Sequence, residues 1–217
     1  MRNLRVWRHV ALIATIAAFG GVASANSFSY TGSFVTDDQI QEFLFSLSGT
    51  STVTAVTYSY AGGTNQAGAS IPQGGFDPWL SIFDSSGTLV ASDDDGTCAQ
   101  VATDSVTGAC FDSFISQSLT AGTYTLVLSQ SDNSPAGGDL GSGYTRTGQT
   151  DFTSSFGCSN GEFCDINADN RTPSWAVDID NVTSSSLPGG AAPEPGTFLL
   201  LGGGFAGIVM LRRRFGL

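Results

Sequence analysis

Aspartates are the densest group of side chains in this sequence that could do chemistry. Asp93, Asp94 and Asp95 stand together in "ASDDDGT", directly before a glycine, and Asp77 and Asp84 lie nearby in the chain. Clustered carboxylate oxygens on a turn are hard ligands that suit Ca²⁺, which takes about 6–8 oxygens. The run does not match an EF-hand loop, because no glutamate follows at the twelfth position. Aspartates also initiate turns. Two interpretations stay open: a Ca²⁺ site that uses Asp93, Asp94 and Asp95, or a solvated hairpin tip.

The side chains that usually carry catalysis are scarce. His9 is the only histidine and stands close to the N-terminus. Beyond it, Ser-His-Asp and Cys-His machinery and histidine-ligated metals are excluded. A pair of carboxylates of the glycosidase type remains, but the sequence does not place two acids at the separation that this reaction needs. We therefore predict no catalytic residues, with a glycan-acting hydrolase as the less favoured alternative.

Four cysteines form two local pairs, Cys98 with Cys110 in "CAQVATDSVTGAC" and Cys158 with Cys164 in "CSNGEFC". Four cysteines allow three connectivities, and the local pairing closes the shortest loops. A zinc site is the rival interpretation, but these spacings are poor matches to zinc motifs and no histidine is near. We predict two local disulfides, which an oxidising compartment favours.

The N-terminus predicts such a compartment. "MRNLRVWRHVALIATIAAFGGVASANS" has a basic head and an apolar run, and it closes on the small residues Ala23 and Ala25. This pattern is typical of a secretory signal peptide. We expect residues 1–25 to direct export through the Sec translocon and to be removed by signal peptidase after Ala25.

The chain that remains after cleavage is strongly acidic. Between Asn26 and Leu187 there are two arginines, no lysine and 18 acids, so the formal charge is −16. Binding to nucleic acid requires clustered Lys and Arg, and anionic membrane surfaces would repel this charge. Nucleic acid is therefore excluded as a partner class.

Apolar residues in the exported chain alternate with period two, which is typical of strands. Phe28, Tyr30 and Phe34 fall on one face, as do Phe43, Phe45 and Leu47. Near 52–60 the pattern places Thr52, Thr54, Val56, Tyr58 and Tyr60 on one face. Asp84 to Gly87 suits a tight turn between two strands. Further strands are expected at 114–119, 122–130, 150–156 and 174–182. The prediction is all-β, an antiparallel β-sandwich that is jelly-roll-like, over residues 26–183.

The chain ends with "APEPGTFLLLGGGFAGIVMLRRRFGL". Residues 184–192 are small and Pro-rich, which predicts a flexible linker. The apolar run from Phe198 to Leu211 predicts a short hydrophobic helix of about 21 Å, against a hydrocarbon core of about 30 Å. Arg212, Arg213 and Arg214 should stay on the cytoplasmic side. This segment suits a transient inner-membrane anchor better than a permanent transmembrane helix.

Residues 193–217 resemble a PEP-CTERM sorting signal. The resemblance rests on Pro193, Glu194 and Pro195, the short apolar run, and the cluster Arg212, Arg213 and Arg214, in this order. It implies recognition and removal of the tail by exosortase, a membrane transpeptidase of Gram-negative bacteria that make exopolysaccharide. It also implies a final location outside the cell, at the cell surface or in the exopolysaccharide matrix of a biofilm.

The exported domain resembles bacterial pre-peptidase C-terminal domains over about residues 34–133. The matching stretches run from Asp37 to Leu47, from Asp77 to Asp84 and from Leu119 to Tyr124. This resemblance implies a non-catalytic β-sandwich module without a shared ligand. We expect a structural or adhesive role, with exopolysaccharide as the candidate partner and Ca²⁺ as the candidate cofactor. A Ca²⁺-dependent carbohydrate-binding module is the alternative, in which aromatic residues would stack on sugars. The candidates for stacking are Trp79, Trp175, Tyr58, Tyr60 and Tyr144.

Overall fold

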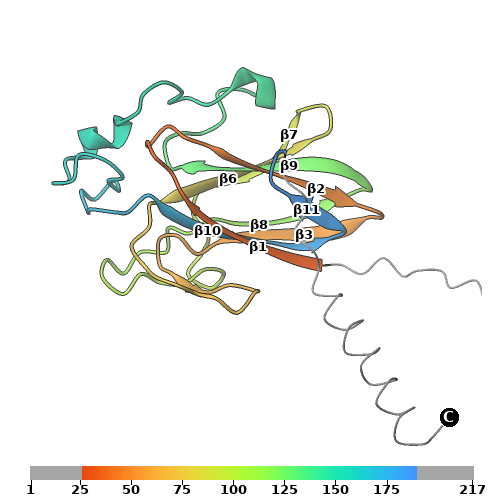
Figure 1. The fold of residues 1–217 in the computed structure, drawn as a ribbon, viewed down its shortest axis with the longest axis horizontal. Helices are drawn as coiled ribbons and strands as arrows, with labels where there is room; N and C mark the ends of the chain where they lie inside the picture. The colour runs from red at the N-terminus through yellow and green to blue at the C-terminus, as the bar shows by residue number, and fades with distance from the viewer. Residues whose placement is uncertain (1–25, 190–217) are drawn as a thin grey trace, which may run out of the picture.

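A computed structural model describes residues 26–189, and these residues fold as two antiparallel sheets packed face to face (Figure 1). This confirms the predicted all-β sandwich. The predicted signal peptide at 1–25, with Ala23 and Ala25, and the predicted C-terminal helix lie outside the described residues. The strands are β1 Asn26–Ser33, β2 Gln41–Leu47, β3 Ser51–Thr57, β4 Gly63–Thr64, β5 Ser70–Ile71, β6 Pro78–Asp84, β7 Leu89–Asp93, β8 Phe114–Leu119, β9 Gly122–Gln130, β10 Ser174–Val182 and β11 Ser184–Ser186.

The strand order shows why the chain rolls into a sandwich. One sheet has the order β1-β10-β3-β8 and the other β11-β2-β9-β6-β7. The long strands pair as a folded-over hairpin: β1 with β10, β2 with β9, β3 with β8, and β6 with β7. The additional pairs β10–β3 and β9–β6 join these hairpin pairs into the two sheets. This rolled hairpin of eight strands is the jelly-roll topology, with β11 added at one edge.

The core fills the space between the sheets with inward-facing residues of alternating pattern. In β2, Phe43, Phe45 and Leu47 are buried, whereas Leu44 between them is 42% exposed on the outer face. The rings of Phe43 and Trp175 pack edge to face with centroids 5.8 Å apart. Burial of such aromatic side chains supplies much of the driving force for folding.

The predicted face of the stretch 52–60 needs a correction. The inward residues of β3 are Val53 and Ala55, both fully buried, whereas Thr52 on the alternate face is exposed. Val56 instead packs outside the main core, in a small cluster with Val101 and Cys110. The threonines between the small apolar residues are β-branched, so they suit the outer side of a strand.

Two other predictions, one of a strand and one of the start of the linker, differ from the structure. The stretch 150–156 was predicted as a strand, but Phe152–Phe156 forms the 3-10 helix η2. The side chain of Asp37 accepts hydrogen bonds from the backbone N–H and the hydroxyl of Thr153, and none of the strands described within residues 26–189 pairs with this stretch. The predicted linker begins at residue 184, but Ser184–Ser186 forms β11 and pairs with β2. A second short 3-10 helix, η1, spans Leu140–Ser142.

The described chain begins and β10 ends at the same end of the sandwich, and β11 then turns back along β2, from Ser184 opposite Ser46 to Ser186 opposite Leu44. Asn26 pairs with Val182, and its side-chain amide donates to the carbonyl of Thr183. The turns β2–β3, β6–β7 and β8–β9 also lie at this end, which we call the proximal end. The opposite, distal end carries the longer connections between strands, as Figure 1 shows.

Candidate metal centre and sheet groove

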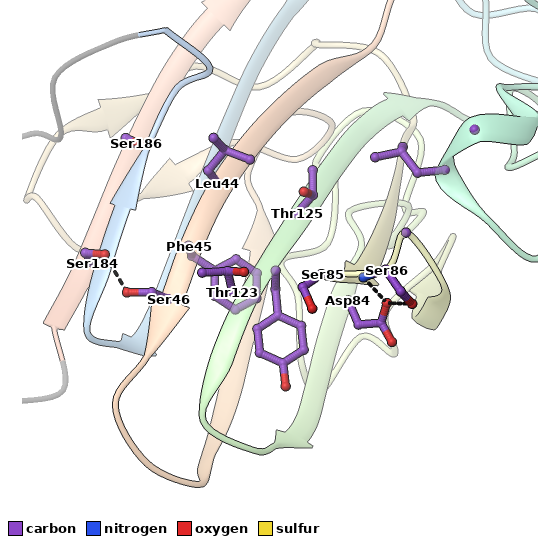
Figure 2. Close-up of a pocket in the computed structure, with 14 residues that line it drawn as sticks. Leu44, Phe45, Ser46, Asp84, Ser85, Ser86, Thr123, Thr125, Ser184 and Ser186 are labelled. Atoms are coloured by element: carbon purple, nitrogen blue, oxygen red, sulfur yellow. Dashed lines mark hydrogen bonds between the residues drawn. The ribbon is translucent and has the colours of Figure 1, made fainter.

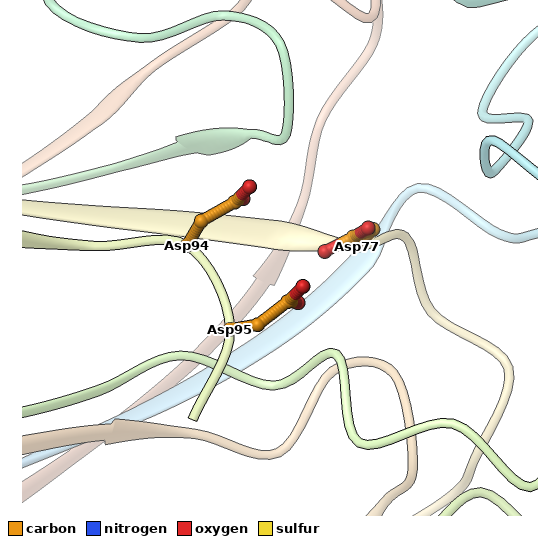
Figure 3. A group of neighbouring side chains, drawn as sticks. All are labelled: Asp77, Asp94 and Asp95. Atoms are coloured by element: carbon orange, nitrogen blue, oxygen red, sulfur yellow. The ribbon is translucent and has the colours of Figure 1, made fainter. Parts of the chain in front are cut away.

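Three aspartates converge at the distal end. Asp77 lies directly before β6, and Asp94 and Asp95 directly follow β7, which pairs with β6. One carboxylate oxygen from each lies within 4.8 Å of those of the other two. Figure 3 shows the side chain of Asp95 extending toward Asp77, with the carboxylate of Asp94 beside them. Pairing of β6 with β7 therefore brings Asp77 to the two sequence-adjacent acids.

Two of the aspartates considered from the sequence lie elsewhere. Asp93 belongs to β7, and its carboxylate accepts a hydrogen bond of 2.8 Å from the backbone N–H of Phe114. Asp84 lies at the far end of β6, where it accepts hydrogen bonds from the backbone N–H groups of Ser86 and Thr88. The cluster thus contains Asp94 and Asp95 of the predicted set but not Asp93. Successive side chains of a strand point to opposite faces, which separates Asp93 from Asp94.

The cluster is electrostatically unfavourable as it stands. Asp77 is buried, Asp94 is half-buried and Asp95 is exposed. Burial raises the pKa of Asp77 well above its usual value, and the charges of Asp94 and Asp95 raise it further. Burial also raises the pKa of Asp94 to about 6, reinforced by Asp95 and opposed by a hydrogen bond from Ser131. Burial raises the pKa of Asp95, with Asp93 adding to the effect. The site favours a bound proton or cation over three free negative charges.

The three carboxylates line a cavity of about 150 Å³. Gln130, the last residue of β9, lines it too and is only 1% exposed. Its amide nitrogen donates to the carbonyl of Cys164, and its amide oxygen has no hydrogen-bond partner in the described structure. Gln130 was not a candidate from the sequence, because only the pairing of Gln130 with Pro78 brings it beside Asp77.

The arginines of the described chain neutralise other acids. Arg171 is buried, and its guanidinium lies 3.2 Å from Asp165 and 3.3 Å from Asp104. It also covers the ring of Tyr60 at 3.5 Å. Arg146 lies 3.8 Å from Asp132 near the surface. Asp132 and Asp165 line the cavity as well, so two of its five aspartates have an arginine partner.

The cysteines form the two disulfides that were predicted, Cys98–Cys110 and Cys158–Cys164. Their Cα atoms are 5.3 and 5.6 Å apart, which is within the usual range for a disulfide. Both bridges fix loops near the distal end. Cys164 also lines the cavity, so the second bridge holds the segment that orients Gln130.

A larger groove of about 710 Å³ lies on the outer face of the second sheet (Figure 2). Its floor crosses β11, β2 and β9, and the β6–β7 turn with Leu140 of η1 forms a wall. Hydroxyl groups dominate the floor, and Leu44 is its most exposed apolar residue. The hydroxyls belong to Ser46, Thr123, Thr125, Ser184 and Ser186.

The aromatic residues considered for sugar stacking are buried or partly buried in the domain. Trp175, Tyr60 and Tyr144 are buried, and Trp79 and Tyr58 are only partly exposed. Trp175 packs against Phe34 and Phe43 between the sheets. None of the five lines the groove of Figure 2. Phe45 and Tyr124 do line this groove, but both are buried, so sugar binding there would rest mainly on hydroxyl and aliphatic contacts.

Comparison with protein families identifies a sorting motif near the C-terminus. A family model described as the PEP-CTERM protein-sorting motif matches residues 191–214. The chain carries this motif. The match implies export, a sorting step at the membrane, and processing by exosortase. Among curated proteins, no match is found.

The residues that carry the sorting signal lie outside the described residues. They are Pro193, Glu194, Pro195, Arg212, Arg213 and Arg214. Within residues 26–189, no helix has both the length and the apolar character needed to cross a membrane.

Proposed function

We propose that this protein is an extracellular β-sandwich, sorted by exosortase, with a structural or adhesive role at the cell surface or in the exopolysaccharide matrix. The observation that carries the proposal is the PEP-CTERM motif at residues 191–214. Such a signal delivers the domain to the outside of the cell, so the domain acts there.

The construction of the domain supports a non-catalytic role. Two disulfides and a jelly-roll core suit a module that must persist outside the cell. The exported chain holds no histidine, and its four cysteines are paired. Nucleophile-and-base chemistry therefore lacks its usual groups. The groove on the outer sheet face supports an adhesive version of the role, because its hydroxyls can hydrogen-bond to a polysaccharide.

Mass spectrometry of the mature protein from a producing cell tests the sorting step. We expect its C-terminus to lie near Pro193 to Pro195, without Arg212 to Arg214. Deletion of the exosortase, or replacement of Pro193 and Pro195 by Ala, should leave a longer form in the membrane fraction. An intact Leu217 on the mature protein of the wild-type cell would contradict the sorting step.

Co-sedimentation with the exopolysaccharide of the same cell tests the adhesive role. We expect binding that weakens when Leu44→Asp places a charge on the groove floor. Leu44 is exposed, so the change should not disturb the core. If the wild-type protein does not bind, the adhesive role is contradicted and only the structural role remains.

A further inference from the structure

We propose that Asp77, Asp94, Asp95 and Gln130 form a Ca²⁺ site that ties together the distal ends of three neighbouring strands. This inference rests on the described residues alone and does not depend on the sorting proposal. The carboxylates lie within 4.8 Å of one another, and Gln130 faces the same cavity.

The second observation is a set of buried acceptors without partners. The Oδ1 atoms of Asp77 and Asp94 and the Oε1 atom of Gln130 accept no hydrogen bond from the described residues. Asp77 is 7% exposed and Gln130 is 1% exposed. A buried polar atom left without a partner costs about 1–3 kcal/mol, and more if it is charged. Three such atoms around one cavity indicate a bound group that satisfies them together.

The charges around the cavity favour a cation in particular. Asp132 and Asp165 have arginine partners, whereas no basic residue of the described chain pairs with Asp77, Asp94 or Asp95. A divalent cation would satisfy the unpaired oxygens and offset most of the clustered charge. It would also reduce the repulsion within a domain of formal charge −16.

The ligand chemistry selects Ca²⁺. Carboxylate and amide oxygens are hard ligands, and the four side chains offer no nitrogen or sulfur that zinc or copper would prefer. Ca²⁺ accepts about 6–8 oxygens in irregular geometry, which bidentate carboxylates and water can complete on the side of the exposed Asp95. Mg²⁺ demands a nearly ideal octahedron. Sites in extracellular modules commonly bind Ca²⁺ with Kd values of about 0.1–1 mM.

The fold shows which strands such a site would link. Asp77 precedes β6, Asp94 and Asp95 follow β7, and Gln130 ends β9. These three strands are neighbours in the order β9-β6-β7. Next to the cavity, the backbone N–H of Ser131 donates to the carbonyl of Asp77 at 2.8 Å. One ion would therefore fix the points where the distal loops leave the sheet.

Calorimetric titration and thermal melting of the mature protein test the site. After treatment with EDTA, the wild-type protein should bind one Ca²⁺, and its Tm should rise by roughly 5–10 °C at about 100 times Kd. Asp94→Asn and Asp95→Asn should each weaken Ca²⁺ binding at least tenfold. Asp95 is exposed, so its variant should fold even if an Asp77 variant does not.

Asp151→Asn is the matched control. Asp151 is exposed and its side chain caps nothing, so the variant loses the same charge away from the cavity. It should bind Ca²⁺ as the wild type does. Three results would overturn the proposal: no saturable Ca²⁺ binding, equal binding by the wild type and Asp95→Asn, or an equal response to Mg²⁺ at the same ionic strength.

Discussion

At the scale of single residues, Arg171 shows how this acidic domain tolerates buried charge. Its guanidinium bridges Asp104 and Asp165 and lies over the ring of Tyr60. A planar guanidinium can make these contacts together, whereas a lysine cannot. Burial raises the pKa of Asp104, but the N–H groups of Thr107 and Val106 and the guanidinium outweigh this effect, so its pKa lies below the usual value.

Arg171→Met should therefore destabilise the protein by about 3–5 kcal/mol at neutral pH, because it leaves two buried carboxylates without their cation. A carboxyl with a lowered folded pKa contributes stability above its unfolded pKa of about 3.9, and this contribution is lost as the pH falls through the folded value. The deficit of the variant should accordingly shrink below about pH 4. Urea unfolding of both proteins between pH 7 and pH 3 measures this difference in the free energy of unfolding. A deficit that stays constant over this range would mean that Arg171 acts through packing alone.

The cluster of acids marks the limit of what single residues reveal in the sequence. Asp94 and Asp95 could be paired from the sequence because they are adjacent. Asp93 was included for the same reason, but the alternation of a strand turns its side chain away from Asp94, and its carboxylate accepts a hydrogen bond from the backbone N–H of Phe114. Asp77 and Gln130 join the cavity only through the pairing of β6 with β7 and β9. That register depends on the whole sheet, so Gln130 had no local signal.

At the scale of elements, the period-two pattern located the long strands, since each has one face in the core, although it assigned the wrong face of β3 to the interior. It failed where burial does not determine the structure. Ser184–Ser186 has no apolar residue and resembles a linker, but its backbone pairs with β2. Ser185 is buried, and its hydroxyl lies 2.9 Å from the hydroxyl of Tyr30. Backbone pairing and the side-chain hydrogen bonds of Ser184 with Ser46 and of Ser185 with Tyr30 hold this strand in place, and these interactions leave no hydrophobic pattern.

Strand β11 should consequently matter for solubility. A chain that ends at Thr183 would leave β2 as an edge strand with unpaired backbone groups and the exposed Leu44. We expect a lower Tm and concentration-dependent association, compared with a chain that ends at Gly189. Light scattering and thermal melting of the two chains measure the difference. If both chains stay monomeric with the same Tm, β11 is dispensable for stability and solubility. A domain that ends at residue 183, as predicted from the sequence, would then be sufficient.

At the scale of the whole molecule, the domain has two different ends. Residue 26 and the first residue of β11 lie at the proximal end, whereas the acid cluster and the loops of both disulfides lie at the distal end. From Ser186 to Pro193 the chain can reach at most about 25 Å. Before processing, this short tether should hold the domain close to the membrane. We predict that the proximal end, where β11 begins, faces the membrane and that the distal end faces outward.

This orientation predicts a difference in chemical access. Thr50, in the β2–β3 turn, is exposed at the proximal end, and Val35, which follows β1, is 77% exposed at the distal end. Thr50→Cys and Val35→Cys each add a single free thiol, because all four native cysteines are paired. In cells without exosortase, a bulky maleimide should modify Val35→Cys much faster than Thr50→Cys, because the bilayer restricts approach to the proximal end.

The processed protein provides the control for this comparison. Once released from the membrane, both variants should react at similar rates, since both positions are exposed in the free domain. Insertion of about 20 Gly/Ser residues between Pro188 and Pro193 should remove the difference in the unprocessed protein as well, because a longer flexible tether lets the domain move away from the bilayer. Equal rates in the original membrane-bound protein would show that the short tether does not orient the domain. The acid cluster would then have no fixed direction relative to the membrane.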